Sequence, residues 1–98
     1  AKGYNKDFII SANMNYVTTT SDGLYERAEI PVSPANSPVG SHIDLFYRKV
    51  DGGEWAYVTG IQGMPNCAEF EGDAIKAYSD FACFYQENGQ LVEKLVGK

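Results

Sequence analysis

The stretch that decides the predicted fold runs from Ile43 to Thr59 and reads IDLFYRKVDGGEWAYVT. In its first half, apolar residues recur at every second position, which is the side-chain period of a β-strand. These residues are Ile43, Leu45 and Tyr47. The pair Gly52-Gly53 then favours a tight turn, and a second apolar run follows it. The stretch therefore predicts an antiparallel hairpin with strands at residues 43–48 and 54–59.

Similar strand signals recur on both sides of this hairpin, each bounded by turn-forming residues. Alternating or β-branched runs predict further strands at residues 8–16, 24–32, 67–71, 81–87 and 90–96. Asn88-Gly89 predicts a two-residue turn of type I′, which requires positive φ at both central residues. A helical turn fits only at residues 73–78, with Asp73 as its N-cap. The chain therefore predicts an all-β fold, an antiparallel two-sheet sandwich of about seven strands, with a barrel as the alternative.

Length and composition predict one autonomous domain over residues 1–98. A chain of 98 residues has room for a single hydrophobic core. Its 44% hydrophobic and 13% aromatic residues are enough to fill that core. The start at Ala1 fits either a removed leader peptide or a fragment of a longer protein.

The charge balance disfavours a nucleic-acid partner. The formal net charge is -5, and the 8 basic residues are scattered along the chain. Phosphate binding needs a concentrated basic surface, which this sequence lacks. The chain also has no apolar run of about 18 residues, so membrane insertion is not expected. The composition leaves the oligomeric state open.

Two segments rich in glycine, proline and small polar residues are expected to be loops. Ser33–Gly40 contains two prolines and a glycine, which neither a sheet nor a helix accommodates, and it is expected to link two layers. Gly60–Asn66 contains two glycines and Pro65. Both loops are candidates for display to a binding partner.

Cys67 and Cys83 are the only cysteines, and we expect a disulfide between them. Such a bond stabilises by about 3 kcal/mol in the chain-entropy estimate, and it indicates a secreted or cell-surface protein. The alternative is two buried thiols in a reducing compartment. Alternation directs Cys67 away from the core, so the bond is expected at the rim, near the second loop. No metal site is expected, because the single histidine, His42, does not complete a zinc site.

The stretches Ile43–Trp55 and Phe81–Gly89 together resemble parts of a known fold. The first is similar to the third strand of a fibronectin type III domain and the turn that follows it. The second is similar to the penultimate strand of such a domain and its hairpin. Residues Ser41–Leu95 thus resemble a fibronectin type III or immunoglobulin-like domain. The resemblance implies a β-sandwich with the strands of Cys67 and Cys83 in opposite sheets, but no particular function.

No set of side chains in the sequence predicts catalysis, so we expect a protein that is not an enzyme and uses no cofactor. Ser41 and His42 are neighbours on a predicted strand and therefore point to opposite faces, which favours a surface or strand-end histidine over a nucleophile and base pair. Glu69, Glu71 and Asp73 lie close together in the sequence. We expect them to form a solvated acidic edge, with calcium binding as the alternative.

Aromatic residues are the feature that points to binding, since 7 tyrosines, 5 phenylalanines and 1 tryptophan are many for so small a core. The candidate binding residues are Trp55, Tyr57, Phe46 and Phe84. We expect a binding or adhesion module that recognises a protein partner through its loops or an aromatic sheet face. The alternatives are a carbohydrate-binding module that stacks a glycan on Trp55 and Tyr57, and a small secreted enzyme inhibitor. The rings would instead be ordinary core residues if loops cover both sheet faces.

Overall fold

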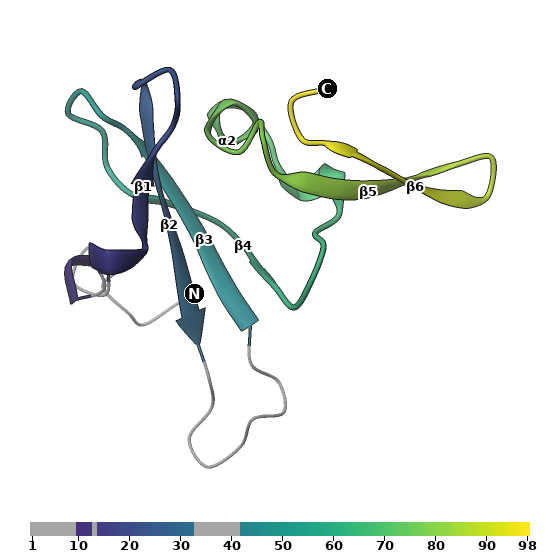
Figure 1. Ribbon diagram of the computed structural model, residues 1–98, viewed down its shortest axis with the longest axis horizontal. Helices are drawn as coiled ribbons and strands as arrows, with labels where there is room; N and C mark the ends of the chain where they lie inside the picture. The colour runs from purple at the N-terminus through teal and green to yellow at the C-terminus, as the bar shows by residue number, and fades with distance from the viewer. Residues whose placement is uncertain (1–9, 13, 33–41) are drawn as a thin grey trace, which may run out of the picture.

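The computed structural model describes residues 10–12, 14–32 and 42–98 (Figure 1). The strands in these ranges are β1 (Val17–Thr19), β2 (Tyr25–Val32), β3 (His42–Lys49), β4 (Ala56–Ile61), β5 (Ala82–Glu87) and β6 (Gln90–Leu95). The short helices are the 3₁₀ helices η1 (Met14–Tyr16) and η2 (Cys67–Glu69) and the α-helix α2 (Asp73–Ala77). The loop predicted at Ser33–Gly40 lies outside the described residues.

The strands form two antiparallel sheets, so the predicted all-β class is confirmed. The larger sheet has the order β1-β2-β3-β4, and the smaller sheet is the hairpin of β5 and β6. The predicted hairpin from Ile43 to Thr59 is present as β3 and β4, with a bulge in their pairing between Leu45 and Phe46. Figure 1 shows β5 and β6 extending away from the larger sheet, with α2 near the inner end of β5.

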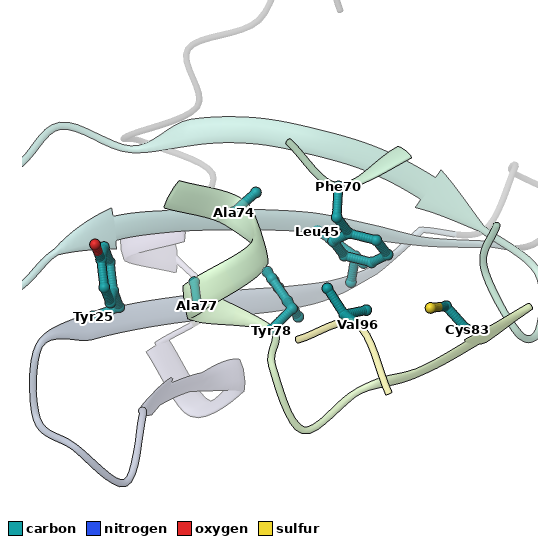
Figure 2. Packing of buried hydrophobic residues seen from close by; sticks show 8 residues of the cluster. All are labelled: Tyr25, Leu45, Phe70, Ala74, Ala77, Tyr78, Cys83 and Val96. Carbon is teal, nitrogen blue, oxygen red and sulfur yellow. The ribbon is translucent and has the colours of Figure 1, made fainter. Parts of the chain in front are cut away.

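Both faces of the larger sheet are covered by other parts of the chain. Leu45 and Phe46 are adjacent on β3, and because successive side chains of a strand point to opposite faces they enter different clusters. Figure 2 draws the first cluster, whose buried members are Tyr25, Leu45, Phe70, Ala74, Ala77, Tyr78, Cys83 and Val96. The buried members of the second are Ile10, Ala28, Ile30, Phe46 and Trp55. α2 and part of the β5–β6 hairpin therefore lie over one face of the larger sheet, and Ile10 and Trp55 pack against the other face.

Tyr78 fastens the end of α2 to the larger sheet. Its side chain is fully buried, and its ring contacts the rings of Phe70 and Phe81 at centroid distances of 5.5 and 5.0 Å. Its hydroxyl donates a hydrogen bond to the carbonyl oxygen of Phe46 at 2.8 Å. Burial raises the pKa of Tyr78, and the charge of Glu29 raises it further, so the hydroxyl stays protonated and able to donate.

The strand predicted at residues 8–16 is wrong where the structure describes it. Residues 10–12 are helical, and Met14–Tyr16 form η1. Ile10 is buried in the second cluster, whereas the side chains of Met14 and Tyr16 are exposed. A single buried anchor does not require an extended backbone, and β2 already pairs with β1 along this edge. The alternation in this stretch therefore does not correspond to a strand pairing.

The strand predicted at residues 67–71 is also wrong, because η2 begins there instead. The side chain of Asn66 accepts a hydrogen bond from the backbone N–H of Ala68 at 2.9 Å, which favours a helical turn over a strand. The predicted disulfide between Cys67 and Cys83 is present, and it joins η2 to β5. Cys83 is fully buried and Cys67 is half-buried, so the bond lies at the rim of the first cluster.

The helical turn predicted at residues 73–78 is present as α2. Its N-cap is Gly72 rather than Asp73, because the chain enters the helix with a φ of 57°, a conformation that favours glycine. Asp73 is instead the first helical residue. No helix within the described ranges is long and apolar enough to cross a membrane.

The turn predicted at Asn88-Gly89 has the expected backbone. Its φ angles are 55° at Asn88 and 80° at Gly89, so both central residues have the positive φ of a type I′ turn. Glu87 faces Gln90 directly across this turn, at the closed end of the β5–β6 ladder.

Candidate functional site

The most distinctive surface feature is a short loop, residues 62–66, between the end of β4 and the start of η2. We call it the anchored loop. The disulfide of Cys67 fastens its end to β5. The backbone N–H of Phe84 on β5 also donates to the carbonyl oxygen of Pro65 at 3.0 Å, and Asn66 forms a single parallel bridge with Phe84. A covalent bond and a backbone bridge therefore hold the loop against β5.

Met64 stands out from this loop while its neighbour is buried. The side chain of Met64 is 44% exposed, whereas Pro65, the next residue, is buried. A methionine side chain is flexible and polarisable, so it adapts to the shape of an apolar partner surface. The anchored loop thus presents an adaptable apolar side chain on a backbone that is already fixed.

Two hollows flank Met64, and its side chain lines both. One hollow has a volume of about 520 Å³, and Phe84 and Glu69 are among the other residues that line it. The other, of about 390 Å³, is lined by Phe81 and Asp80 and is mostly apolar. Met64 is thus an exposed apolar residue between two hollows that carry polar groups at their margins.

A third hollow lies along the outer edge of β4. It has a volume of about 350 Å³, and Tyr47, Glu69 and Glu71 are among the residues that line it. Glu69 accepts a hydrogen bond from the hydroxyl of Thr59 at 3.0 Å, so it connects η2 to β4. Glu69 also lines the larger hollow beside Met64, which makes the two hollows neighbours. Of the three residues of the predicted acidic edge, Glu69 borders the hollow beside Met64, Glu71 lines only the third hollow, and Asp73 lies 3.8 Å from the ammonium of Lys49.

An ion pair between Arg27 and Asp80 sets the charge at the opposite border. Arg27 on β2 hydrogen-bonds to Asp80 and to the carbonyl oxygen of Ala77 at the end of α2. The hydrogen bond from Arg27, together with its positive charge, lowers the pKa of Asp80. Burial alone would lower the pKa of Arg27, but Asp80 and Glu29 raise it above its ordinary value. Both groups therefore stay charged at neutral pH.

The four aromatic residues predicted to bind a ligand do not form one surface. Phe46 and Trp55 are 1% and 6% exposed, and both belong to the second hydrophobic cluster. The guanidinium of Arg48 covers the ring of Trp55 at 4.6 Å from its centroid. Tyr57 is exposed and Phe84 is half-buried, and the two line different hollows. Trp55 therefore offers no open ring face beside Tyr57 on which a sugar could stack.

His42 lies on β3 beside Asp44, with its Nε2 atom 3.0 Å from a carboxylate oxygen of Asp44. The two residues are two positions apart on one strand, so their side chains share a face. Ser41, which the sequence places next to His42, lies outside the described residues. Within the described ranges there is no group of three or more His, Cys, Asp or Glu side chains placed to hold a metal ion.

Sequence reasoning missed Met64 and the pair of Arg27 with Asp80. A signal for Met64 exists, because an apolar residue between Gly63 and Pro65 in a loop has no strand or helix to bury it. The ion pair has no such signal, since its partners are 53 residues apart in the chain. Comparison with protein-family models, with curated proteins and with solved structures found no match to this chain.

Proposed function

We propose that this chain is a non-catalytic binding or adhesion module that recognises a protein partner through the anchored loop. The observation that carries the proposal is the position of Met64, exposed between two hollows on a loop fastened by the Cys67–Cys83 disulfide. A loop that is already ordered loses little conformational entropy on binding, so more of its contact energy contributes to affinity.

The composition of the surface also supports a protein partner. Met64 and the half-buried rings of Phe81 and Phe84 supply an apolar centre, and the carboxylates of Glu69 and Asp80 lie at the margins. Protein interfaces commonly combine a small apolar centre, often containing methionine and aromatic residues, with a polar rim. Two hollows beside one protruding side chain suit a partner that inserts side chains around Met64.

The proposal places the module in a secreted or cell-surface protein. The support is the disulfide, since such bonds persist in oxidising compartments and are rare in reducing ones. The finer fold class, an immunoglobulin-like or fibronectin type III-like sandwich, is part of the same proposal, and two antiparallel sheets around a shared cluster support it. A thiol assay on unfolded, unreduced protein from an oxidising preparation tests the compartment, and two free thiols there would contradict it.

A second candidate is a small inhibitor that inserts the anchored loop into an enzyme cleft. The covalent fastening of the loop at Cys67 favours it, because inhibitory loops act by remaining rigid in the cleft. This candidate predicts that the partner is an enzyme whose activity falls when the domain binds. The glycan alternative receives less support, because Trp55 is buried.

The test is a binding screen of the purified domain against panels of extracellular proteins and of glycans. Three forms are compared: wild type, Met64→Asp, and Met14→Asp. Met14 is the matched control, because its side chain is 58% exposed but lies on η1, outside the proposed surface. We expect protein binders whose affinity falls about tenfold or more with Met64→Asp, as for a central interface residue, and is unchanged with Met14→Asp.

Two outcomes would contradict the proposal. One is a protein binder that loses equal affinity with both variants, since a contact at the anchored loop cannot produce that pattern. The other is binding confined to glycans and lost with Tyr57→Ala, which would favour the carbohydrate-binding alternative. Matching circular dichroism spectra and unfolding midpoints of wild type, Met64→Asp, Met14→Asp and Tyr57→Ala confirm that the substitutions have not unfolded the domain.

A further inference from the structure

The outer edge of β6 is open for pairing with another strand. β6 is the last strand of the β5–β6 sheet, and within the described residues no strand pairs with its other side. The backbone N–H of Val96 donates to the carbonyl oxygen of Phe81 at 2.9 Å, toward β5. Because hydrogen-bonding groups alternate along an antiparallel strand, those of Leu91, Glu93 and Leu95 point away from β5. The carbonyl oxygen of Leu95 already accepts a hydrogen bond from the backbone N–H of Lys98 at 3.0 Å, so the open part of the edge ends at the N–H of Leu95.

The side chains of these same three residues share one face of the hairpin. Leu91 and Leu95 are 66% and 39% exposed, and Glu93 between them is also exposed. The cross-strand neighbour of Glu93 on that face is Phe84, which is uncharged. No ion pair joins Glu93 to another of the described residues. The edge therefore carries a carboxylate between two exposed leucines.

The opposite face of the hairpin and the outer edge of β5 are both occupied by contacts of their own. Lys94, the nearest cation in the sequence, points to the opposite face, where its ammonium lies 5.1 Å from the ring centroid of Tyr85. The far edge of β5 is already in use, since Phe84 bonds to Pro65 in the anchored loop. β6 is thus the open edge of this small sheet.

The edge also lacks most of the features that protect edge strands. Proteins commonly guard such strands by keeping them short, placing proline or charged residues in them, or covering them, and of these features β6 has charged residues, Glu93 and Lys94. β1, an edge strand of the larger sheet, is only three residues long and contains two threonines. β6 is six residues long, contains no proline and exposes two leucines. A two-stranded sheet is also only marginally stable by itself, so a third strand would stabilise it.

We propose that β6 accepts an extended segment of a partner protein as a third strand, and that this segment carries a lysine or arginine between two apolar residues at alternate positions. The backbone N–H and carbonyl groups of Leu91 and Glu93, together with the N–H of Leu95, supply the hydrogen bonds of the ladder. The basic residue lies opposite Glu93, and the two apolar residues lie opposite the leucines. Cross-strand pairs of opposite charge stabilise a sheet, and like charges destabilise it, so Glu93 selects the sign of the central residue.

The test uses two synthetic peptides, acetyl-Thr-Leu-Thr-Lys-Thr-Leu-Thr-amide and its counterpart with glutamate in place of lysine. Binding to the full chain is measured by titration, with amide chemical shifts in NMR to locate the site. We expect the lysine peptide to bind about fivefold more tightly than the glutamate peptide, from the usual strength of exposed cross-strand pairs. The shifted amides should be those of residues 90–96.

A charge reversal sharpens this test. Glu93→Lys should reverse the preference, so that the glutamate peptide binds more tightly. Glu54→Lys is the matched control, because it makes the same change in net charge at an exposed residue between β3 and β4. We expect this control variant to keep the wild-type preference for lysine, because Glu54 is not on the β6 edge.

The leucines are tested in the same way. Leu91→Ser should weaken binding of the lysine peptide, whereas Leu24→Ser, at a leucine that is 62% exposed in the turn before β2, should not. The proposal would be overturned if wild type and Glu93→Lys showed the same preference between the lysine and glutamate peptides. It would also be overturned if the peptide shifted NMR signals of amides outside the hairpin. A concentration-dependent dimer that Leu91→Ser abolishes would also overturn it, by assigning the edge to a second copy of the chain.

Discussion

Two parts of the chain cover the same face of the larger sheet, and they are held there by different means. α2 and the residues after it are attached by packing and polar contacts, through the buried ring of Tyr78 and the ion pair of Arg27 with Asp80. The β5–β6 hairpin enters the cluster through Cys83 and Val96, and it is joined to η2 by the disulfide of Cys67. A helix of five residues is too short to be stable alone, so its stability comes from the packing of its neighbours. The hairpin, with few buried side chains, depends more on a covalent bond.

The largest effect is expected for Tyr78→Ala, which removes the main noncovalent attachment of α2. The change leaves a cavity in the first cluster, and we expect it to lower the free energy of unfolding by about 3–5 kcal/mol. The measurement is the urea midpoint of unfolding. Tyr16→Ala, at an exposed tyrosine in η1, serves as the control and should change the midpoint little. A small effect of Tyr78→Ala would mean that α2 is not held by this ring.

Tyr78→Phe separates the ring from its hydroxyl. It keeps the packing but removes the hydrogen bond to the carbonyl oxygen of Phe46, so we expect a loss of only about 1 kcal/mol. If Tyr78→Phe instead costs as much as Tyr78→Ala, the hydrogen bond rather than the packing attaches α2.

The next largest effect is expected when Cys67 and Cys83 are both replaced by serine. Loss of a disulfide that closes a loop of this size should lower the free energy of unfolding by about 3 kcal/mol. If the hairpin depends on this bond more than α2 does, hydrogen exchange should accelerate more at residues 82–95 than at residues 73–77. Equal acceleration in both segments would show that the two parts unfold together, and the contrast between them would not hold.

A smaller and more local effect is expected for Gly89→Val, which places a β-branched residue at a φ of 80°. A Cβ atom at Gly89 would meet no other atom within 4 Å, so the cost comes from the backbone alone, about 1–3 kcal/mol. Gly89→Asn is the matched control, because asparagine tolerates positive φ and should cost much less. Amides of β5 and β6 should lose protection before those of α2. Equal stability of the two variants would argue against a type I′ turn.

The smallest effect is expected for Asp80→Asn, which removes the ion pair at the end of α2. Arg27 lowers the pKa of Asp80 below its ordinary value of 3.8, so the pair stabilises the folded protein above that pH and the contribution is lost as pH falls through the folded pKa. Because Asp80 is exposed, we expect a loss of at most about 1 kcal/mol at neutral pH. The difference between wild type and Asp80→Asn should shrink in urea titrations repeated below pH 3.8. A difference that persists there would assign the stability to another cause.

Local signals in the sequence identified the elements that local interactions specify. The Asn88-Gly89 turn and the hairpin of β3 and β4 follow from turn residues and alternation within one stretch, and both are present. The helical turn at α2 was also found, although the position of its cap was one residue off. The disulfide could be predicted because only one pairing of two cysteines exists.

The candidate surface was harder to predict from the sequence. Its loop was recognised from its glycines and proline, but alternation could not show whether the aromatic residues face solvent or a second layer. Phe46 and Trp55 were candidate binding residues, with burial in the core as the alternative, and both are buried, because they pack with Ile10 on the second face of the larger sheet. The strands predicted at residues 8–16 and 67–71 are absent where the structure describes these residues, for a related reason: a strand needs a partner edge, and none of the described strands pairs with them.

By itself, the sequence determined the all-β class, the main hairpins, the loop that carries Met64 and the cysteine pair, because each depends on neighbouring residues or on a single available partner. The tertiary structure alone decided which aromatic rings are buried, that Tyr78 donates to β3, and that Arg27 meets Asp80 across 53 positions of the chain. It also decided that, among the described strands, none pairs with the outer edge of β6. These features depend on which layers of the fold meet, and a pattern of period two along one strand carries no information about what lies on either side of it.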